Sequence, residues 1–453
     1  RLLMSVIGSN ILAGAAGQGG GYVIDNSLRL RSSASAYLSR TPATDGDRKT
    51  WTWSGWVKRG GLSFIQDLFL AKTNTTSDFS VRFLNDDTLA VRKRTSAALE
   101  YSASTSAVFR DPSAWYHIIV VFDTTQTTSS DRIKLYVNEQ SVALSGSYPS
   151  LNSIQPVNNT IEHQVGADTN ASRYFDGYLA EVNFIDGQAL TPSSFGDYNE
   201  DTGVWQPAKY AGSYGTNGFY LNFSDATTTS TLAEDSSGNG NNWTPNNISL
   251  TAGVTYDSMT DTPTPYADGG NYAVLNPLDK TFNTSGTFVD GNLGVTSCTS
   301  TVNASFWQTS GKWYFETVFS AISGASSLVE VGLRNKTAAT GNIQGYLSSG
   351  NKDLDTAQTA YGATYTVGDV IGCAFDLDVK SITFYKNGVS QGAFTYTDGD
   401  AYTPSMIARG TTTWSGSINF GQRPFAYTPP TGFKTLHTGN LPDSAIENGS
   451  EYF

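Results

Sequence analysis

Short runs in which apolar and polar residues alternate recur along the first half of the chain, separated by turn-forming residues. DFSVRFLN (78–85) and TLAVRKR (88–94) alternate with period two, and the Asn85-Asp86-Asp87 cluster between them predicts a hairpin. AWYHIIVVFD (114–123) is nearly continuous in apolar residues, as expected for a central strand buried on both faces. Many short strands at this spacing predict a β-sandwich or jelly roll over residues 25–198.

The second half of the chain repeats this kind of pattern over residues 271–437. The segment 365–388 predicts a buried strand, a turn and a second strand, and it ends in Asn387-Gly388, a strong hairpin signal. Between the two domains, residues 199–270 predict a β extension that packs on the first domain, followed by a linker rich in Pro, Asp and Thr. The expected fold class is therefore all-β, with two antiparallel β-sandwich (jelly-roll) domains joined by that extension and linker.

The two ends of the chain differ from these domains in composition. Residues 1–24 combine apolar and small residues with a Gly-rich end, but Ser5 and Asn10 interrupt the apolar run that a secretory signal requires. We predict an N-terminal assembly arm that packs along a partner subunit; a retained targeting segment and a simple first strand are the alternatives. We expect the C-terminal tail, residues 438–453, to lead into further sequence.

Composition narrows the class of function. The 453 residues carry 28 Lys+Arg against 40 Asp+Glu, a net charge of -12, which argues against nucleic-acid binding. No stretch approaches the ~18 continuous apolar residues that cross a bilayer, so we expect no membrane insertion. Only 15% of residues are charged, whereas Gly, Tyr and Phe are abundant, as suits a β-rich protein with many turns.

Four motifs follow one another in the first domain: WSGWVK (53–58), WYHIIVVFD (115–123), IKLYVNEQ (133–140) and FDGYLAEVNFIDGQALT (175–191). Their order resembles that of the concanavalin A-like/laminin-G-like jelly roll. That family includes lectins, adhesins, glucanases and structural modules, so the resemblance implies a fold more strongly than a function.

The second domain carries another ordered set of motifs: GKWYFETVFS (311–320), VEVGLRN (329–335), YTVGDVIGCAFDLDVKSITFYKNG (365–388), YTPSMIARG (402–410) and INFGQRPFAYTPPTGFKTL (418–436). This order resembles a SPRY domain, in which the loops at one end of the sandwich bind peptides or other partners. Tyr346 and Trp414 lie in segments rich in Gly, Ser and Thr, so they are the candidate ligand-binding loop aromatics; packing of each residue on its own sheet is the preferred interpretation.

Candidate catalytic groups are few. Laminarinase-type jelly rolls carry Glu-x-Asp-x-x-Glu, whereas the nearest string here has Glu181, Asn183 and Asp186 at those positions. His117 lies in an apolar strand and is predicted to be a hydrogen-bonded core residue rather than a base. No Gly-x-Ser-x-Gly elbow is present, and Cys298 and Cys373 are expected to be buried free thiols. We predict that the protein is not an enzyme.

We expect no cofactor and no dedicated metal site. The loop Asp235 to Asn242 has the oxygen-rich, glycine-turned composition of a calcium loop but lacks its spaced carboxylates. A plain turn held by Asp and Asn side chains is the preferred interpretation, and a weak calcium site is the alternative.

An arm, a laminin-G-like domain and a SPRY domain in one chain resemble structural proteins of tailed marine phages. The resemblance implies a fibre, knob or capsid decoration on the exterior of the virion, which contacts other virion proteins through the arm and a host-surface glycan or protein. We expect a homo-oligomer with closed symmetry, a trimer if the protein is a fibre. The alternatives are an extracellular bacterial adhesin that binds glycans and the non-catalytic part of a polysaccharide hydrolase.

Overall fold

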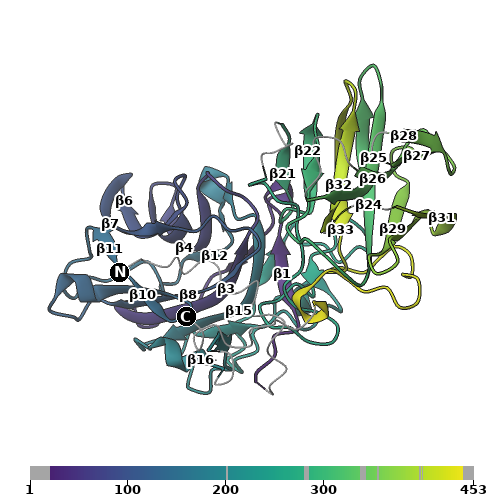
Figure 1. Cartoon of the computed structure of the whole chain (residues 1–453). Coiled ribbons are helices and arrows are strands. Elements are labelled where there is room, and N and C mark those ends of the chain that lie inside the picture. The colour runs from purple at the N-terminus through teal and green to yellow at the C-terminus, as the bar shows by residue number, and fades with distance from the viewer. Residues whose placement is uncertain are drawn as a thin grey trace, which may run out of the picture. The chain divides into compact units, whose positions relative to one another are not determined.

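The computed structural model describes residues 21–199, 203–279, 285–336, 343–354, 357–396, 399 and 401–441. These residues form two compact units, each built from antiparallel sheets (Figure 1). Unit 1 comprises residues 21–250 and 257–271, and unit 2 comprises residues 251–256 and 272–441, within the described ranges. The all-β fold class predicted from the sequence is confirmed.

Unit 1 contains two large sheets. Sheet 1 consists, in spatial order, of β10 (Gln140–Val142), β9 (Ile133–Val137), β8 (Trp115–Asp123), β3 (Thr50–Arg59), β15 (Gly177–Asp186), β1 (Ser27–Leu30) and β20 (Ser258–Met259), with β18 (Phe219–Leu221) also paired to β15. Sheet 2 consists of β11 (Leu144–Gly146), β7 (Ala98–Val108), β6 (Thr88–Thr95), β5 (Ser77–Phe83), β4 (Gln66–Asn74), β12 (Glu162–Val165), β2 (Tyr37–Arg40) and β19 (Thr244–Asn246).

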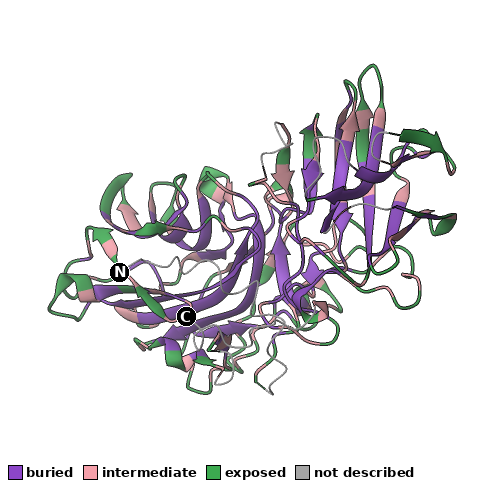
Figure 2. Ribbon diagram, in the orientation of Figure 1, coloured by how far each residue is buried: buried purple, intermediate pink, exposed green. Residues whose placement is uncertain are grey.

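The core of unit 1 lies between these sheets, and it receives large apolar side chains from both. Trp51 of β3, for example, stacks on Phe122 of β8 and meets Phe79 of β5 edge-on. Every residue of β8 is buried, as Figure 2 shows for the central strands. The face of β8 that points away from this core is also covered, because Ile119 packs in a separate apolar cluster with Phe195. The predicted strand buried on both faces is therefore confirmed.

Unit 2 is a second sandwich. Sheet 3 consists of β21 (Thr287–Val289), β22 (Gly294–Cys298), β33 (Thr413–Asn419), β24 (Lys312–Ser323), β29 (Val370–Asp376), β30 (Ser381–Lys386) and β31 (Val389–Thr395). Sheet 4 consists of β23 (Val302–Asn303), β32 (Tyr402–Arg409), β25 (Leu328–Asn335), β26 (Ile343–Leu347), β27 (Asn351–Leu354) and β28 (Ala357–Ala360).

Local turn chemistry explains the hairpins. Asn387 and Gly388 both have positive φ, 48° and 78°, as a two-residue hairpin turn between β30 and β31 requires. The predicted hairpin between β5 and β6 is also present, with Asp87 in the left-handed region at its end.

The remaining described elements are short: α2 (Thr229–Leu232), the 3-10 turns η2 (Ser32–Ala34), η3 (Ser129–Arg132), η4 (Thr169–Ala171), η5 (Pro192–Ser194) and η6 (Thr438–Asn440), and the two-stranded pairs β13 (Ala167–Asp168) with β14 (Arg173–Tyr174) and β16 (Gly196–Tyr198) with β17 (Trp205–Pro207).

The described residues of segment 199–270 lie mostly in unit 1, where the sequence places the β extension. Its described residues add β18, β19 and β20 to the sheets of unit 1. The Pro, Asp and Thr-rich part also carries two fully buried carboxylates: Asp257 pairs with Arg29 and Arg31, and Asp261 pairs with Lys58 at 2.7 Å. Buried ion pairs fix this segment in place, so most of it is an integral part of unit 1 rather than a linker.

Two predictions on the termini fall largely outside the described residues. They concern the arm (1–24), of which the structure describes only residues 21–24, and the tail (438–453), of which it describes only residues 438–441. Within the described residues, no helix has the length and hydropathy needed to cross a bilayer.

Candidate functional site

The outer face of sheet 2 in unit 1 gathers charged and hydroxyl side chains from three neighbouring strands. Alternation along β4, β5 and β6 directs apolar side chains such as Val81 and Val91 into the core and leaves the intervening residues on the opposite face. We call the outward-facing polar set the polar face: Asp67, Lys72, Asp78, Ser80, Arg82, Arg92 and Arg94.

Strand register pairs opposite charges across the polar face. Asp67 lies directly opposite Arg82, and Asp78 lies directly opposite Arg94. The Arg94 Nε–H donates a 2.7 Å hydrogen bond to Asp78 Oδ2. The Nη2 of Arg82 is 2.7 Å from Asp67 Oδ1, which makes an ion pair but lacks hydrogen-bond alignment. Cross-strand pairs of this kind set the positions of the side chains on a sheet surface.

Several polar atoms on this face are buried without a hydrogen-bond partner, although Asp67, Ser80 and Arg82 are 0% exposed. Leaving such a group unpaired costs about 1–3 kcal/mol, and unpaired buried groups are rare in folded proteins. None of these atoms is exposed at the surface, and Asp67 and Arg82 also form an ion pair, so this part of the face belongs to the interior of unit 1. The atoms are both carboxylate oxygens of Asp67, Oδ1 of Asp78, Oγ of Ser80, Nε, Nη1 and Nη2 of Arg82, and Nε of Arg92.

Two further charges extend the polar face from the loop that contains η4. Asp168 Oδ2 is 3.9 Å from Arg82 Nη2 and 3.5 Å from Arg173 Nη1. Burial raises the pKa of Asp67 to about 6, although Arg82 opposes the shift. Burial, reinforced by the charges of Arg82 and other arginines, lowers the pKa of Arg92 to about 10. The polar face thus carries many charged side chains close together, and their charges shift the pKa values of their neighbours.

Glu181 occupies a strained position in sheet 1. It lies in a β-bulge of β15 between Ala180 and Asn183 and has a φ of 50°, in the left-handed region. Its carboxyl accepts a 2.6 Å hydrogen bond from the hydroxyl of Tyr220, whose oxygen lies 2.8 Å from that of Tyr22. Burial raises the pKa of Glu181 to about 7. This carboxyl is held within the fold by tyrosines.

Asp186, the last member of the glucanase-like string, has a structural role. Its carboxylate accepts hydrogen bonds from the backbone N–H groups of Asp47 (2.8 Å) and Asn217 (2.9 Å) and from the side chain of Asn158 (2.8 Å). The carboxyl groups of both Glu181 and Asp186 are therefore used to hold loops and strands together. This arrangement agrees with the prediction that the string is not a catalytic pair.

His117 is a hydrogen-bonded core residue, as predicted. The indole N–H of Trp205 donates to its Nδ1 at 2.9 Å, so Nε2 carries the proton and contacts Ser54 Oγ at 2.8 Å. Its ring stacks on Trp56. Burial lowers the pKa of His117 to about 3, which keeps the ring neutral.

The loop from Asp235 to Asn242 is a turn held by side chains. The two carboxylate oxygens of Asp235 accept hydrogen bonds from the backbone N–H groups of Tyr220 and Asn241, and its neighbour Ser237 donates to both. This geometry favours the plain-turn interpretation. No group of three or more His, Cys, Asp or Glu side chains in the described ranges is arranged to hold a metal ion. Cys298 and Cys373 are buried free thiols, as expected.

Tyr346, predicted to be a ligand-binding loop aromatic, is a core residue in β26. It is 0% exposed, and its ring packs against Tyr365 and Phe384 at centroid distances of 5.0 and 5.5 Å. Its hydroxyl donates to the carbonyl of Ala363. The prediction of an exposed loop position is therefore wrong, because the Gly and Ser residues around Tyr346 belong to a strand and its turn.

Trp414, the second predicted ligand-binding residue, lies in β33 and is also 0% exposed. Its indole meets Phe319 edge-on at 5.5 Å, and its N–H donates to the carbonyl of Ser300 at 3.2 Å. The loop placement is wrong here too. The next three residues, Ser415, Gly416 and Ser417, are small, so the period-two alternation of β33 is hard to recognise in the sequence.

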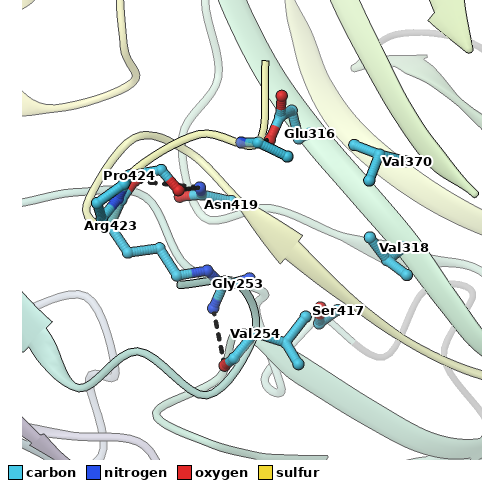
Figure 3. A pocket seen from close by; sticks show the side chains of 10 residues that line it. Gly253, Val254, Glu316, Val318, Val370, Ser417, Asn419, Arg423 and Pro424 are labelled. Carbon is cyan, nitrogen blue, oxygen red and sulfur yellow. Dashed lines mark hydrogen bonds between the residues drawn. The ribbon is translucent and has the colours of Figure 1, made fainter. Parts of the chain in front are cut away.

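Unit 2 contains a small cavity on the face of sheet 3 opposite the core (Figure 3). Val254, Val318 and other apolar side chains form most of its wall. The polar residues beside it are occupied: Glu316 accepts the backbone N–H of Ala426, and Arg423 donates to the carbonyl of Val254. Its volume of about 80 Å³ is far below the roughly 300–1,000 Å³ of a small-molecule site, so we assign it no ligand.

A buried acidic pair lies on sheet 4. Arg409 donates 2.5 Å hydrogen bonds to both Glu330 and Asp353, whose side chains are almost fully buried. The other oxygen of Glu330 has no hydrogen-bond partner. Burial raises the pKa of Glu330 to about 8, and Asp353 adds to the shift while Arg409 opposes it. Glu330 is therefore largely protonated in the folded protein at neutral pH.

This protonation has a measurable consequence for stability. The folded state holds the proton of Glu330 in a pH range where the unfolded chain has lost it, so its contribution to the unfolding free energy falls as pH rises from about 4.5 toward 8. Glu330→Gln removes this dependence. We expect the stability of the variant relative to the parent to rise by at least about 1 kcal/mol between pH 5 and pH 8. Urea unfolding at several pH values measures this, and a constant difference between the two proteins would contradict it.

The fold and these sites define a class of protein: two β-sandwich units whose buried carboxylates hold strands and loops together. Residues 32–194 match the family model described as the concanavalin A-like lectin/glucanases superfamily. Residues 312–423 match the model of the SPRY domain. The chain thus carries a concanavalin A-like domain followed by a SPRY domain, both of which are typically non-catalytic binding modules.

Curated relatives match short segments only. The chain is 40% identical over 96 residues to the E3 ubiquitin-protein ligase RKP of Arabidopsis thaliana, and 31% identical over 93 residues to the ATP-dependent RNA helicase Ddx1 of Drosophila melanogaster. Each match covers 20% of this chain, and they cover 7% and 12% of the two relatives.

Similar solved structures include the SPRY domain of human HERC1, at 20% identity and a TM-score of 0.28, which covers 32% of this chain and 96% of that domain. A putative carbohydrate binding protein from Bacteroides ovatus is 16% identical with a TM-score of 0.35, covering 50% of this chain and 59% of the other.

Proposed function

We propose that the protein is a non-catalytic virion structural protein of a tailed phage that attaches to a host-surface glycan through unit 1. The observation that carries the binding part is the match of residues 32–194, which lie in this unit, to the model of the concanavalin A-like lectin/glucanases superfamily.

The proposed position on the virion rests on sequence features. Low charge and abundant Gly, aromatic and hydroxyl residues suit a rigid surface-exposed β protein, and the predicted arm provides contacts to other virion proteins or to copies of the chain. We place the protein on the exterior of the particle as a homo-oligomer. Repeated copies raise avidity, so each copy requires only modest affinity.

Density-gradient fractionation of the source material, with mass spectrometry of each fraction, tests this function. We expect the chain to co-sediment with DNA-filled particles at a fixed multiple of the major capsid protein. A few copies per particle would indicate a tail or fibre, and hundreds would indicate a capsid decoration. Recovery at the top of the gradient or with cell envelopes would contradict the virion role and favour an extracellular adhesin that binds glycans through the same unit.

A further inference from the structure

Three side chains with complementary chemistry meet in the interior of unit 1. The ammonium nitrogen Nζ of Lys58, in β3, lies 2.7 Å from Asp261 Oδ2 and 2.8 Å from Asn271 Oδ1. Lys58 and Asp261 are 0% exposed, and Asn271 is 2% exposed. We propose that this group forms an intramolecular isopeptide bond, in which the Nζ of Lys58 is joined to the Cγ of Asn271 with release of ammonia. The inference does not depend on the proposed function.

Strand register holds the amine and the carboxyl group in place. Lys58 lies directly opposite Trp115 of β8 and Tyr178 of β15, so an aromatic residue flanks it on each neighbouring strand. The indole N–H of Trp115 donates a 3.0 Å hydrogen bond to Asp261 Oδ1. Lys58 Nζ lies 5.6 Å from the centroid of the Tyr178 ring. Because these contacts fix both side chains, the reacting groups are already oriented toward each other.

The amide of Asn271 is oriented as an acceptor for the amine. Its Oδ1 accepts from Lys58 Nζ, and its Nδ2–H donates a 2.7 Å hydrogen bond to the carbonyl of Ser113. This assignment of oxygen and nitrogen satisfies both neighbours, since an ammonium group only donates and a carbonyl only accepts. A C=O bond is about 1.2 Å long, so Nζ is at most about 4 Å from Cγ, near the roughly 3–3.5 Å of groups poised to react.

Burial favours the uncharged forms that the reaction requires. Removal from water lowers the pKa of Lys58, although the charge of Asp261 opposes the shift. Transfer of one proton across their 2.7 Å hydrogen bond turns the ammonium and the carboxylate into a neutral amine and a neutral acid. A neutral amine is the nucleophile for attack on an amide carbon, and the acid beside it can move protons between the reacting atoms.

The step balances with these three side chains alone. The lone pair of Lys58 Nζ attacks Asn271 Cγ, and the acid proton of Asp261 stabilises Oδ1 of the tetrahedral intermediate. Asp261 then carries a proton from Nζ to Nδ2, the bond between Cγ and Nδ2 breaks, and Nδ2 leaves as ammonia. The products are an amide between Lys58 and Asn271, ammonia and the regenerated acid of Asp261. No group is oxidised or reduced.

The bond gives unit 1 a covalent link between distant parts of the chain. It joins β3 to Asn271 and closes a ring that contains every strand from β4 to β20. A link across a long loop stabilises a fold by constraining the unfolded chain, as a disulfide does. An amide, unlike a disulfide, is not cleaved by reducing agents.

Intact-mass spectrometry of the purified full chain tests the proposal. We expect a mass about 17 Da, one ammonia molecule, below that of the amino-acid sequence. Lys58→Arg and Asn271→Ala each lack one reacting group, so each should have the full mass of its own sequence. Lys134→Arg changes an exposed lysine of the same unit and should keep the loss. A full-mass parent protein would overturn the proposal, and so would a loss that persists in Lys58→Arg.

Peptide mapping of the parent protein locates the bond and decides the matter even if no variant folds. It is needed because succinimide formation at an Asn-Gly turn such as Asn387-Gly388 also releases ammonia. After trypsin digestion we expect a branched peptide that contains both Lys58 and Asn271, with no cleavage after Lys58. Separate, unlinked peptides for these two residues would overturn the proposal. A loss of about 18 Da, one water molecule, with the branch at Asp261 would overturn the assignment of Asn271 as the group that Lys58 attacks.

Discussion

Trp414→Ala is expected to lower the unfolding free energy of unit 2 by about 3–5 kcal/mol, the usual cost of removing a large buried aromatic side chain. Trp414 is fully buried in β33, between β22 and β24, and its indole packs against Phe319 and donates to Ser300. Replacement by Ala leaves a cavity and removes one hydrogen bond to the Ser300 carbonyl. Urea unfolding, followed by tryptophan fluorescence and circular dichroism, measures the loss.

Tyr427→Ala provides the matched control, because Tyr427 is 37% exposed and its truncation should cost far less. If Trp414→Ala keeps the stability of the parent and loses affinity for a ligand instead, Trp414 is a binding residue and its assignment to the core is wrong.

Asp257→Ala is expected to destabilise unit 1 by about 3–5 kcal/mol, because it removes a fully buried carboxylate that pairs with two arginines. The carboxylate of Asp257 accepts hydrogen bonds from Arg29 (3.1 Å), from Arg31 (2.8 and 3.1 Å) and from the backbone N–H of Ser249 (2.9 Å). Both Asp257 and Arg29 are 0% exposed. Thermal and urea unfolding of the full chain should show an early transition in the variant.

Asp131→Ala removes an exposed carboxylate whose partner is Lys134 at 3.6 Å, and it should change stability little. Similar small losses for Asp257→Ala and Asp131→Ala would mean that the segment around Asp257 behaves as a linker, as its composition suggests.

Local patterns in the sequence were sufficient for the main strands. The unbroken apolar run of β8 and the Asn387-Gly388 turn each carry their structural signal within about ten residues. Both domains could be predicted for the same reason, because each consists of several such strands in a recognisable order. The boundary of the first domain was harder to predict, because β18, β19 and β20 have only two or three residues each and pair with strands distant in the chain.

Predictions from local residue composition failed where contacts between distant segments bury residues that usually lie in loops. Asp257 lies in a stretch rich in Thr and Asp, a composition typical of a linker, yet its carboxylate is buried against two arginines that are distant in the sequence. Trp414 is followed by Ser, Gly and Ser, which read as a loop, although Trp414, Gly416 and Ile418 share the inner face of a strand.

The polar face was visible in the sequence only as an alternation of charged and apolar residues. DFSVRF and AVRKR place Asp78, Ser80 and Arg82 on one strand face and Arg92 and Arg94 on the next. Such residues normally face solvent. Their burial, and the absence of hydrogen-bond partners for several of their atoms, depends on how the sheets and loops pack and cannot be derived from a local pattern.

The most direct test of the account is a glycan array of neutral and acidic oligosaccharides, probed in parallel with the folded full chain and with a heat-unfolded sample of the same chain. The account predicts that the folded protein binds a subset of the glycans and that the unfolded sample binds none. Absence of binding by the folded protein, or equal binding by both samples, would contradict glycan attachment through unit 1.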